Sequence, residues 1–134
     1  MNESPLFSKF FDFMAWVIPM TVKFPKEHRF VLAESVQRVV LAAHEAVTRA
    51  GFTKDFTAIA RELDQVALYL NLTRFYLRLA VHMTLITLKQ HEFAAGSLAE
   101  IGRIVESWKQ KNSTNQKEAE EKEAKKMVPG AVTG

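Results

Sequence analysis

The chain has 134 residues, 48% of them hydrophobic, and its ten Phe stand against only five Gly and four Pro. This length suits one domain with a substantial core, and the scarcity of turn formers favours long helices over a turn-rich β fold. The absence of cysteine excludes disulfides and thiolate metal sites and fits a reducing cytoplasm. The formal net charge of +3 belongs to residues 1–111, because four Lys balance four Glu from Asn112 onward. A basic body of this kind indicates an anionic partner.

Neither the amino terminus nor the most apolar run of the sequence indicates a membrane protein. The amino terminus, MNESPLFSKFF, lacks the cationic region and the cleavage site of a secretory signal. The most apolar run, residues 77–88, contains Arg78 and His82 and is too short to span a bilayer. We therefore expect a soluble, cytoplasmic protein with no membrane partner.

The first predicted helix spans residues 5–22 and is apolar on more than one side. One stripe has helical spacing: Leu6, Phe10, Phe13, Val17 and Met20. Other apolar side chains lie off that stripe: Phe7, Phe11, Met14, Trp16 and Ile18. A helix that is apolar most of the way round is buried on several faces. In so small a domain, this predicts contact with another protomer or another protein.

The stretch Lys23–Phe30 (KFPKEHRF) predicts a sharp corner with a basic rim. Pro25 disfavours a helical conformation at Phe24 and suits the first turn of the helix that follows. We expect the two phenylalanines, Phe24 and Phe30, to pack the corner and Arg29 to pair or cap nearby.

Two further helices are predicted over residues 26–50 and 54–83. Gly51 is expected to end the first of them as its C′ residue, and Thr53 to cap the second. The helix over 54–83 carries two offset apolar stripes, which again exceed what one bundle needs to bury. The first stripe is Ile59, Leu63, Val66, Leu70 and Leu77, and the second is Leu68, Leu72, Phe75, Leu79 and Met83.

The chain is predicted to turn at residues 84–87 and to form a fourth helix over 88–110. Thr87 and Gln90 have the spacing of a capping box. Beyond residue 111 the sequence loses its apolar periodicity, so residues 112–134 are expected to form a disordered charged tail. Residues 1–111 then form an all-α, antiparallel up-down-up-down four-helix bundle. Two further buried stripes are predicted for it from helical spacing: Leu32, Val36, Val39, Ala43 and Val47 of the helix over 26–50, and Ala94, Leu98, Ile101, Val105 and Trp108 of the helix over 88–110.

Two kinds of chemistry find little support. A di-iron bundle needs Glu-x-x-His pairs, and this chain has none; we predict no metal site and no cofactor. A helical RNase would need an Arg and a His on one face of a helix. Arg38 and His44 are six residues apart, which places them about 240° apart around a helix and not on one face. An RNase is therefore the third and least favoured of the three functions that we consider.

The basic residues are better candidates for binding. Arg74 and Arg78 lie one turn apart, and neither has an acidic residue three or four positions away. Further cations complete the candidate phosphate-contacting surface: Lys23, Lys26, Arg29 and Arg38. The alternative is an ordinary solvated face, or arginines that pair across helices or protomers.

Four segments, in order, carry a family resemblance. They are FDFMAWVIP (11–19) with KFPK (23–26) and RFVL (29–32), RFYLRLA (74–80), EIGR (100–103) and Trp108. Over about residues 6–110 the chain resembles the accessory variability determinant (Avd) proteins of diversity-generating retroelements. These belong to a wider four-helix family that includes proteins encoded in intervening sequences of bacterial 23S rRNA genes.

The resemblance implies a non-enzymatic protein that assembles into a barrel-like homopentamer. It also implies two partners, the reverse transcriptase of the element and nucleic acid (template RNA or cDNA). The family protein supports mutagenic reverse transcription, with errors at adenines. The alternative is an interaction protein of the rRNA intervening-sequence type, with no reverse transcriptase partner.

Overall fold

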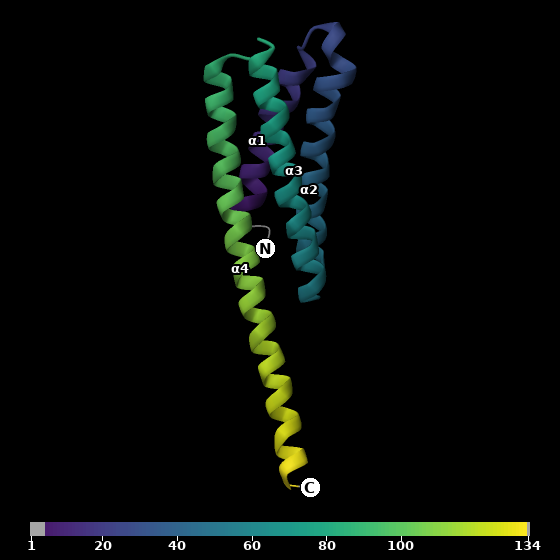
Figure 1. The fold of residues 1–134 in the computed structure, drawn as a ribbon, viewed down its shortest axis with the longest axis vertical. Helices are drawn as coiled ribbons and strands as arrows, with labels where there is room; N and C mark the ends of the chain where they lie inside the picture. The colour runs from purple at the N-terminus through teal and green to yellow at the C-terminus, as the bar shows by residue number, and fades with distance from the viewer. Residues whose placement is uncertain (1–4, 134) are drawn as a thin grey trace.

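The computed structural model describes the backbone of residues 5–133 and the side chains of residues 5–127. These residues form four α helices and no strand: α1 Pro5–Val22, α2 Glu34–Phe52, α3 Phe56–His82 and α4 Leu88–Thr133 (Figure 1). The prediction of an all-α, four-helix fold is therefore confirmed.

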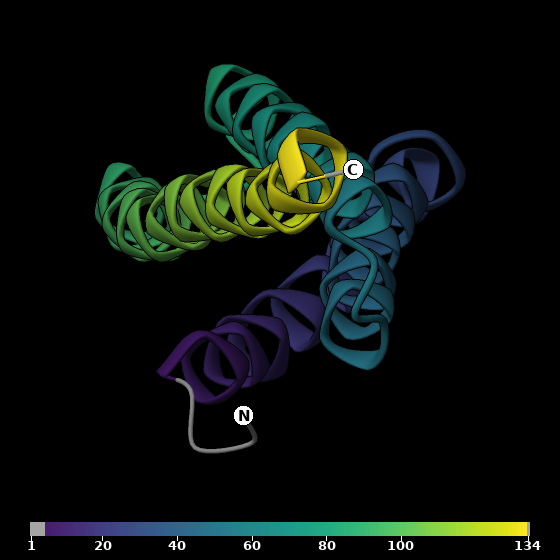
Figure 2. The ribbon, with the colours of Figure 1, turned by 90° about the horizontal axis from the view of Figure 1, so that it is seen from below.

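Over most of the length of α1, the four helices pack side by side. In Figure 1 the chain runs up α1, down α2, up α3 and down α4. α3 lies between α2 and α4, and α1 closes the arrangement against α2 and α4 (Figure 2). α1 and α3 are thus diagonal partners.

The core is made of the helical stripes that the sequence predicted. In α1 the predicted stripe is buried except for Met20, which is only partly covered, and Thr21 is buried in addition. Thr21 is satisfied there because its hydroxyl donates to the Ile18 carbonyl (2.8 Å) and accepts from Gln37 Nε2 (2.9 Å). The other buried stripes are Leu32, Val36, Val39, Ala43 and Val47 of the second helical segment, Leu63, Val66, Leu70 and Leu77 of α3, and Ala94, Leu98, Ile101 and Val105 of α4.

The corner after α1 differs from the prediction in two ways. A 3-10 turn (Lys26–His28) and a π-helical turn (Arg29–Ala33) precede α2, so the regular helix starts at Glu34 and not at residue 26. Phe24 is buried as expected, but Phe30 is 79% exposed, so the prediction that it packs the corner is wrong. The wider π turn changes the angular position of each residue. Leu32 and Ala33 face the core as a result, and Phe30 faces solvent.

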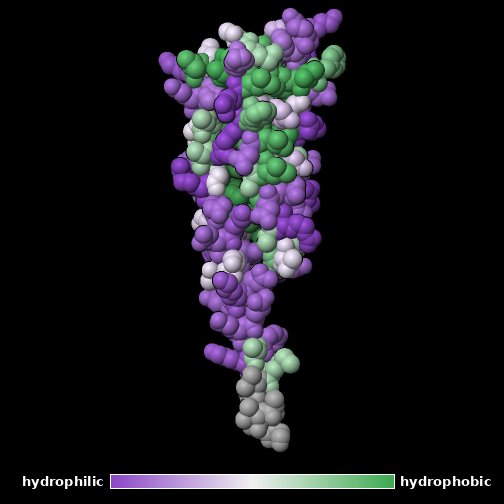
Figure 3. All heavy atoms as spheres, viewed as in Figure 1, coloured by the Kyte–Doolittle hydropathy of each residue, from purple (hydrophilic) through white to green (hydrophobic). Residues whose placement is uncertain are grey.

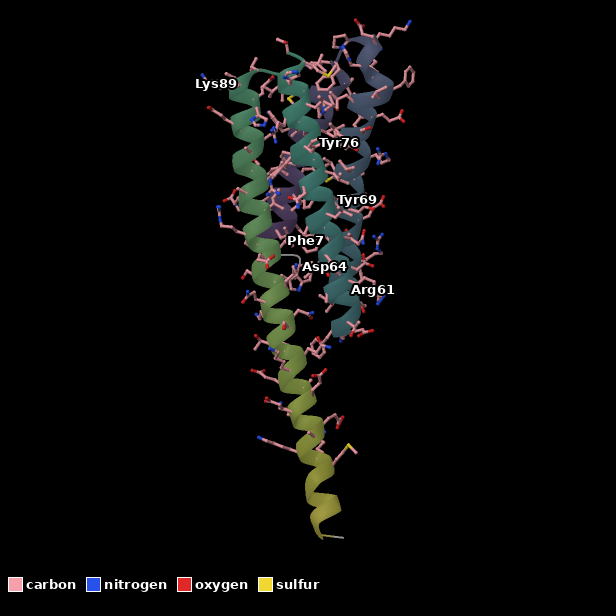
Figure 4. The ribbon with its side chains drawn as sticks, in the orientation of Figure 1. Phe7, Arg61, Asp64, Tyr69, Tyr76 and Lys89 are labelled. Carbon is pink, nitrogen blue, oxygen red and sulfur yellow. The ribbon has the colours of Figure 1, made fainter. Side chains whose placement is uncertain are left out.

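The α2–α3 joint corrects two predicted caps. Gly51 lies inside α2, which continues to Phe52, and its φ is not positive. A Cβ at Gly51 would lie 3.4 Å from the Phe7 ring, so this glycine is a site of close packing with α1 (Figure 4). The N-cap of α3 is Asp55, whose carboxylate accepts from the Thr57 N–H (3.1 Å). Thr53 instead accepts from the Asp55 N–H (3.2 Å).

The α3–α4 turn has the predicted position. Thr87 and Gln90 bond reciprocally, at 2.9 and 3.0 Å, so the predicted capping box is confirmed. α3 ends in a Schellman arrangement, in which the Leu85 N–H bonds to the Ala80 carbonyl and the Thr84 N–H to the Val81 carbonyl. Thr84 occupies the position that glycine usually takes, with a φ of 62°.

The carboxyl-terminal segment was predicted to be disordered, and in the structure it is helical to Thr133; Gly134 lies outside the described residues. α4 extends beyond the other three helices (Figure 1). Asn112 is the last buried residue among the side chains that the structure describes, and its Nδ2 donates to the Phe56 carbonyl (3.0 Å). The segment beyond it is rich in Ala, Glu and Lys, which have high helix propensity. Low hydrophobicity prevents this segment from joining the core, but it does not prevent it from being helical.

Candidate nucleic-acid and partner interface

Arg74 lies across the seam between α3 and α4. Its Nη1 donates to Asn71 Oδ1 (2.7 Å) within α3, and its Nη2 donates to the Leu98 carbonyl of α4 (3.2 Å). A Cβ added at Gly102 would lie 3.3 Å from Nη2, so the glycine leaves space for the guanidinium. Arg74 is therefore both an element of packing and a fixed positive charge.

Arg78 lines the same groove one turn further along α3. The groove encloses about 390 Å³. It is lined by the described residues Asn71, Arg74, Phe75, Leu77, Arg78, His91, Ala94, Ala95 and Leu98. No carboxylate is among these residues. Arg78 is exposed, and its side chain has no ion pair or hydrogen bond within the described part of the chain.

His91 belongs to this groove, although no sequence pattern singled it out as a binding residue. The signal that could have found it is the symmetry of a helical hairpin. Residues equally far from the turn at 84–87 lie side by side when two helices run back along each other. The late turns of α3 then face the first turns of α4.

The other four candidate cations do not join the groove. Arg29 donates from Nε to the Phe24 carbonyl (3.3 Å), so it stabilises the corner, as expected. Lys23 and Lys26 are exposed at that corner. Arg38 is exposed on α2, where its Nη2 bonds to Ser35 Oγ (3.4 Å). The six predicted residues thus divide among a groove, a corner and the outer face of α2.

An apolar strip on α3 lies beside the groove. Four residues of the second predicted stripe of this helix are between 38% and 60% exposed: Leu68, Phe75, Leu79 and Met83. In Figure 3 hydrophobic side chains gather over α3 and the adjoining upper ends of the molecule. The tyrosines of α3 that Figure 4 labels, Tyr69 and Tyr76, are partly buried against the core. Other large apolar side chains are exposed elsewhere, among them Phe11, Phe30 and Phe52, so this strip is one part of the apolar surface that a single protomer leaves uncovered.

The residues considered for RNase chemistry have separate environments. The His44 ring packs edge-on against Phe10 of α1, with centroids 5.8 Å apart, whereas Arg38 lies on the solvated side of α2. Among the residues that the structure describes, no group of three His, Cys, Asp or Glu side chains could hold a metal ion. No helix in that same part of the chain is both long and apolar enough to cross a bilayer.

Three comparisons place these features among known proteins. A family model described as bAvd-like matches residues 6–112. No curated protein matched the chain. Among solved structures, the fold is similar to a crystal structure of a protein of unknown function from the S23 ribosomal protein family of Bacteroides thetaiotaomicron. The TM-score is 0.74 at 18% identity, and the match covers 82% of this chain and 99% of that chain. At this identity the likeness shows the fold alone.

Proposed function

Because the chain belongs to the bAvd-like family, as its motifs indicated, we propose that it is a non-enzymatic accessory subunit of a diversity-generating retroelement. In this role it binds the reverse transcriptase of the element and the template RNA or cDNA, in the cytoplasm, and supports mutagenic reverse transcription.

The observation that carries the proposal is the α3–α4 groove. It holds two guanidinium groups and a histidine, and none of its described lining residues is acidic. Arg74 is held in place by two hydrogen bonds, and Arg78 has no partner of its own among the described residues. Fixed and unneutralised guanidinium groups are suited to phosphate oxygens.

The proposed assembly is a homopentamer, in which the apolar strip of α3 is covered by a neighbouring copy. A strip that is 38–60% exposed on one protomer is the kind of surface that marks an interface. Five copies of a chain with formal charge +3 carry +15 in total, which would attract a polyanion and make its binding depend on salt.

A second candidate is a four-helix interaction protein of the rRNA intervening-sequence type. The chain shares its four-helix fold with a structure from the S23 ribosomal protein family, and this fold is compatible with either candidate. The two candidates differ in one respect that is easily checked. An accessory subunit is encoded beside a reverse transcriptase gene, and the absence of such a gene would favour the second candidate.

The direct test is co-purification of the chain with that reverse transcriptase, together with binding of the template RNA. Arg78→Ala should reduce RNA or enzyme binding without affecting the fold, because the exposed Arg78 side chain forms no ion pair or hydrogen bond among the described residues. Arg74→Ala/Arg78→Ala should reduce it further. Arg61→Ala/Lys125→Ala removes two exposed cations elsewhere and is the matched control. Equal binding by all variants would remove the groove from the interface, and no binding by the wild type would contradict the proposed function.

A further inference from the structure

A second hollow is lined by residues at the start of α3 and midway along α4. At this end of the bundle α4 extends past its neighbours (Figure 1). The volume of the hollow is about 890 Å³, more than twice that of the α3–α4 groove. α1, α3, α4 and the α2–α3 joint all contribute to its walls. None of the candidate binding residues predicted from the sequence lies in it.

Four cations line this hollow against one carboxylate: Lys9, Lys54, Arg103 and Lys111, with Glu100. Glu100 is 3.0 Å from Lys9 Nζ and so is already paired. The other three cations form no side-chain ion pair or hydrogen bond among the described residues. Three unpaired positive charges around one hollow create a local field that favours an anion.

The neighbouring Lys109 differs from these three cations because it is paired with carboxylates. Its Nζ lies 3.0 Å from Asp64 Oδ1 of α3 and 3.8 Å from Glu106. The hydrogen bond to Asp64 raises the pKa of Lys109. Lys109 is therefore engaged between helices, whereas Lys111 faces the hollow without such a partner.

The hollow also presents two aromatic rings. Trp108 and Phe56 line it, and both are only partly buried. Trp108 packs on the core, so its ring is supported from behind. The hydrogen bond from Asn112 to the Phe56 carbonyl ties α4 to the start of α3 at this site. The rings are thereby held on two helices that are fixed relative to each other.

We propose that this hollow binds single-stranded nucleic acid. Unpaired cations beside partly exposed aromatic rings are the combination that single-strand binding uses, with phosphates on the cations and bases stacked on the rings. A base must be unpaired to stack on a ring that lines a hollow, so a duplex does not satisfy the site. An acidic peptide would use the cations but leave the rings without a flat partner. The assignment shares its ligand class with the proposed function, but it concerns different residues.

Trp108 provides a direct readout. The chain has two tryptophans, so Trp16→Phe leaves Trp108 as the only indole. In this full-length variant, oligo(U) and oligo(dT) should quench the Trp108 emission, because a base stacked on the ring changes its surroundings. A duplex of equal charge and polyglutamate should not quench it. Equal quenching by the duplex would overturn the single-strand assignment, and quenching by polyglutamate would assign the hollow to an acidic peptide instead.

Charge reversal tests the cations. Lys54→Glu/Lys111→Glu should weaken oligo(U) binding by at least about tenfold at 0.1 M salt. It should also make the dependence of log K on log salt shallower by about 1.4, which corresponds to two phosphate contacts on a single strand. Both side chains are exposed, so the fold is retained. Lys125→Glu/Lys126→Glu makes the same change in net charge on the far part of α4 and is the matched control.

The outcomes separate the two sites. Equal losses in the hollow variant and the control would mean that only net charge matters, and would overturn the proposal. Loss of oligonucleotide binding in Arg74→Ala/Arg78→Ala alone would overturn it too, while leaving the proposed function intact. Failure of the wild type to bind the reverse transcriptase would contradict the proposed function, but quenching of Trp108 by single strands would still support the hollow.

Discussion

Thr84 has a φ of 62°, in the left-handed region that β-branched residues rarely adopt. The Schellman bonds at the end of α3 require this conformation at the C′ position. Glycine adopts it without a steric cost, so Thr84→Gly should raise the free energy of unfolding by about 1 kcal/mol. Urea titration followed by circular dichroism would measure the change.

The control for this substitution is Thr114→Gly, on the exposed part of α4. There the backbone is helical, and glycine is expected to lower stability or leave it unchanged. A loss of stability in Thr84→Gly would show that the threonine side chain contributes more than its backbone conformation costs.

Gly96 and Gly102 of α4 make a second pair of predictions. A Cβ at Gly96 would meet no atom within 4 Å, so Gly96→Ala should stabilise the protomer by about 1 kcal/mol through helix propensity. A Cβ at Gly102 would lie 3.3 Å from Arg74 Nη2, so Gly102→Ala should gain less, because the guanidinium must move. Thermal unfolding of both variants at one protein concentration would compare them. Equal gains in stability would show that the Arg74 guanidinium moves aside without destabilising the protomer.

Single residues were the level at which sequence-based prediction was least reliable. The exposed Phe30 and the internal Gly51 depended on the form of a turn and on the approach of Phe7 from α1. Neither feature is visible in local residue types. By contrast, the capping box of Thr87 and Gln90 is a local motif, and the structure has it.

At the level of elements, α4 divides into two parts at Asn112. Before this residue the helix has a buried stripe, and after it the described side chains are almost all exposed. We expect deletion of residues 117–134 to leave the thermal unfolding midpoint of the bundle nearly unchanged, because none of the described side chains in this segment contributes to the core. The deletion begins after Asn115, so the described residues that line the second hollow are all retained.

Differential scanning calorimetry would measure the midpoint, and hydrogen exchange of the full chain would show the tail exchanging much faster than residues 98–105. Isolated polar helices gain only about 0.2–0.5 kcal/mol from each i,i+4 ion pair, so the tail helix has little stability of its own. A large fall in the midpoint on deletion would show that the extension packs on something, in this protomer or in a neighbouring one.

The helices themselves were predictable because hydrophobic periodicity determines which face of a helix is buried. α1 spans the same residues as the first predicted helix, and the buried stripes of α3 and α4 were largely identified in advance. The tail was not, since low hydrophobicity excludes a segment from the core without deciding its backbone conformation. The π turn at Arg29–Ala33 has no sequence signature that we could have used.

For the whole molecule, the main prediction concerns assembly. If the apolar strip of α3 is an interface, Leu68→Lys/Leu79→Lys should dissociate the oligomer while leaving the helical content unchanged. Light scattering coupled to size-exclusion chromatography would give the mass, and far-UV circular dichroism the helicity. Met127→Lys, on the exposed tail, is the control for adding a charge at an apolar side chain. A wild-type monomer would contradict the proposed pentamer.

The two basic sites show the limit of sequence reasoning about function. Arg74 and Arg78 belong to one helix, so their spacing alone suggested that they act together. The cations of the second hollow come from α1, the α2–α3 joint and α4. Periodicity orders residues around one helix but does not say which helix begins beside which, so only the folded chain brings these residues to one place.

The boundary at Asn112 has a practical consequence. The family match also ends at this residue, so the shared architecture and the buried part of α4 stop together. In the structure about 23 Å of helix separates Asn112 from Met127. A fluorophore or cross-linker attached at position 127 would therefore report on the surroundings of the bundle without disturbing it. The extension thus offers a labelling position outside the bundle, from which the distance to a bound partner can be measured in solution.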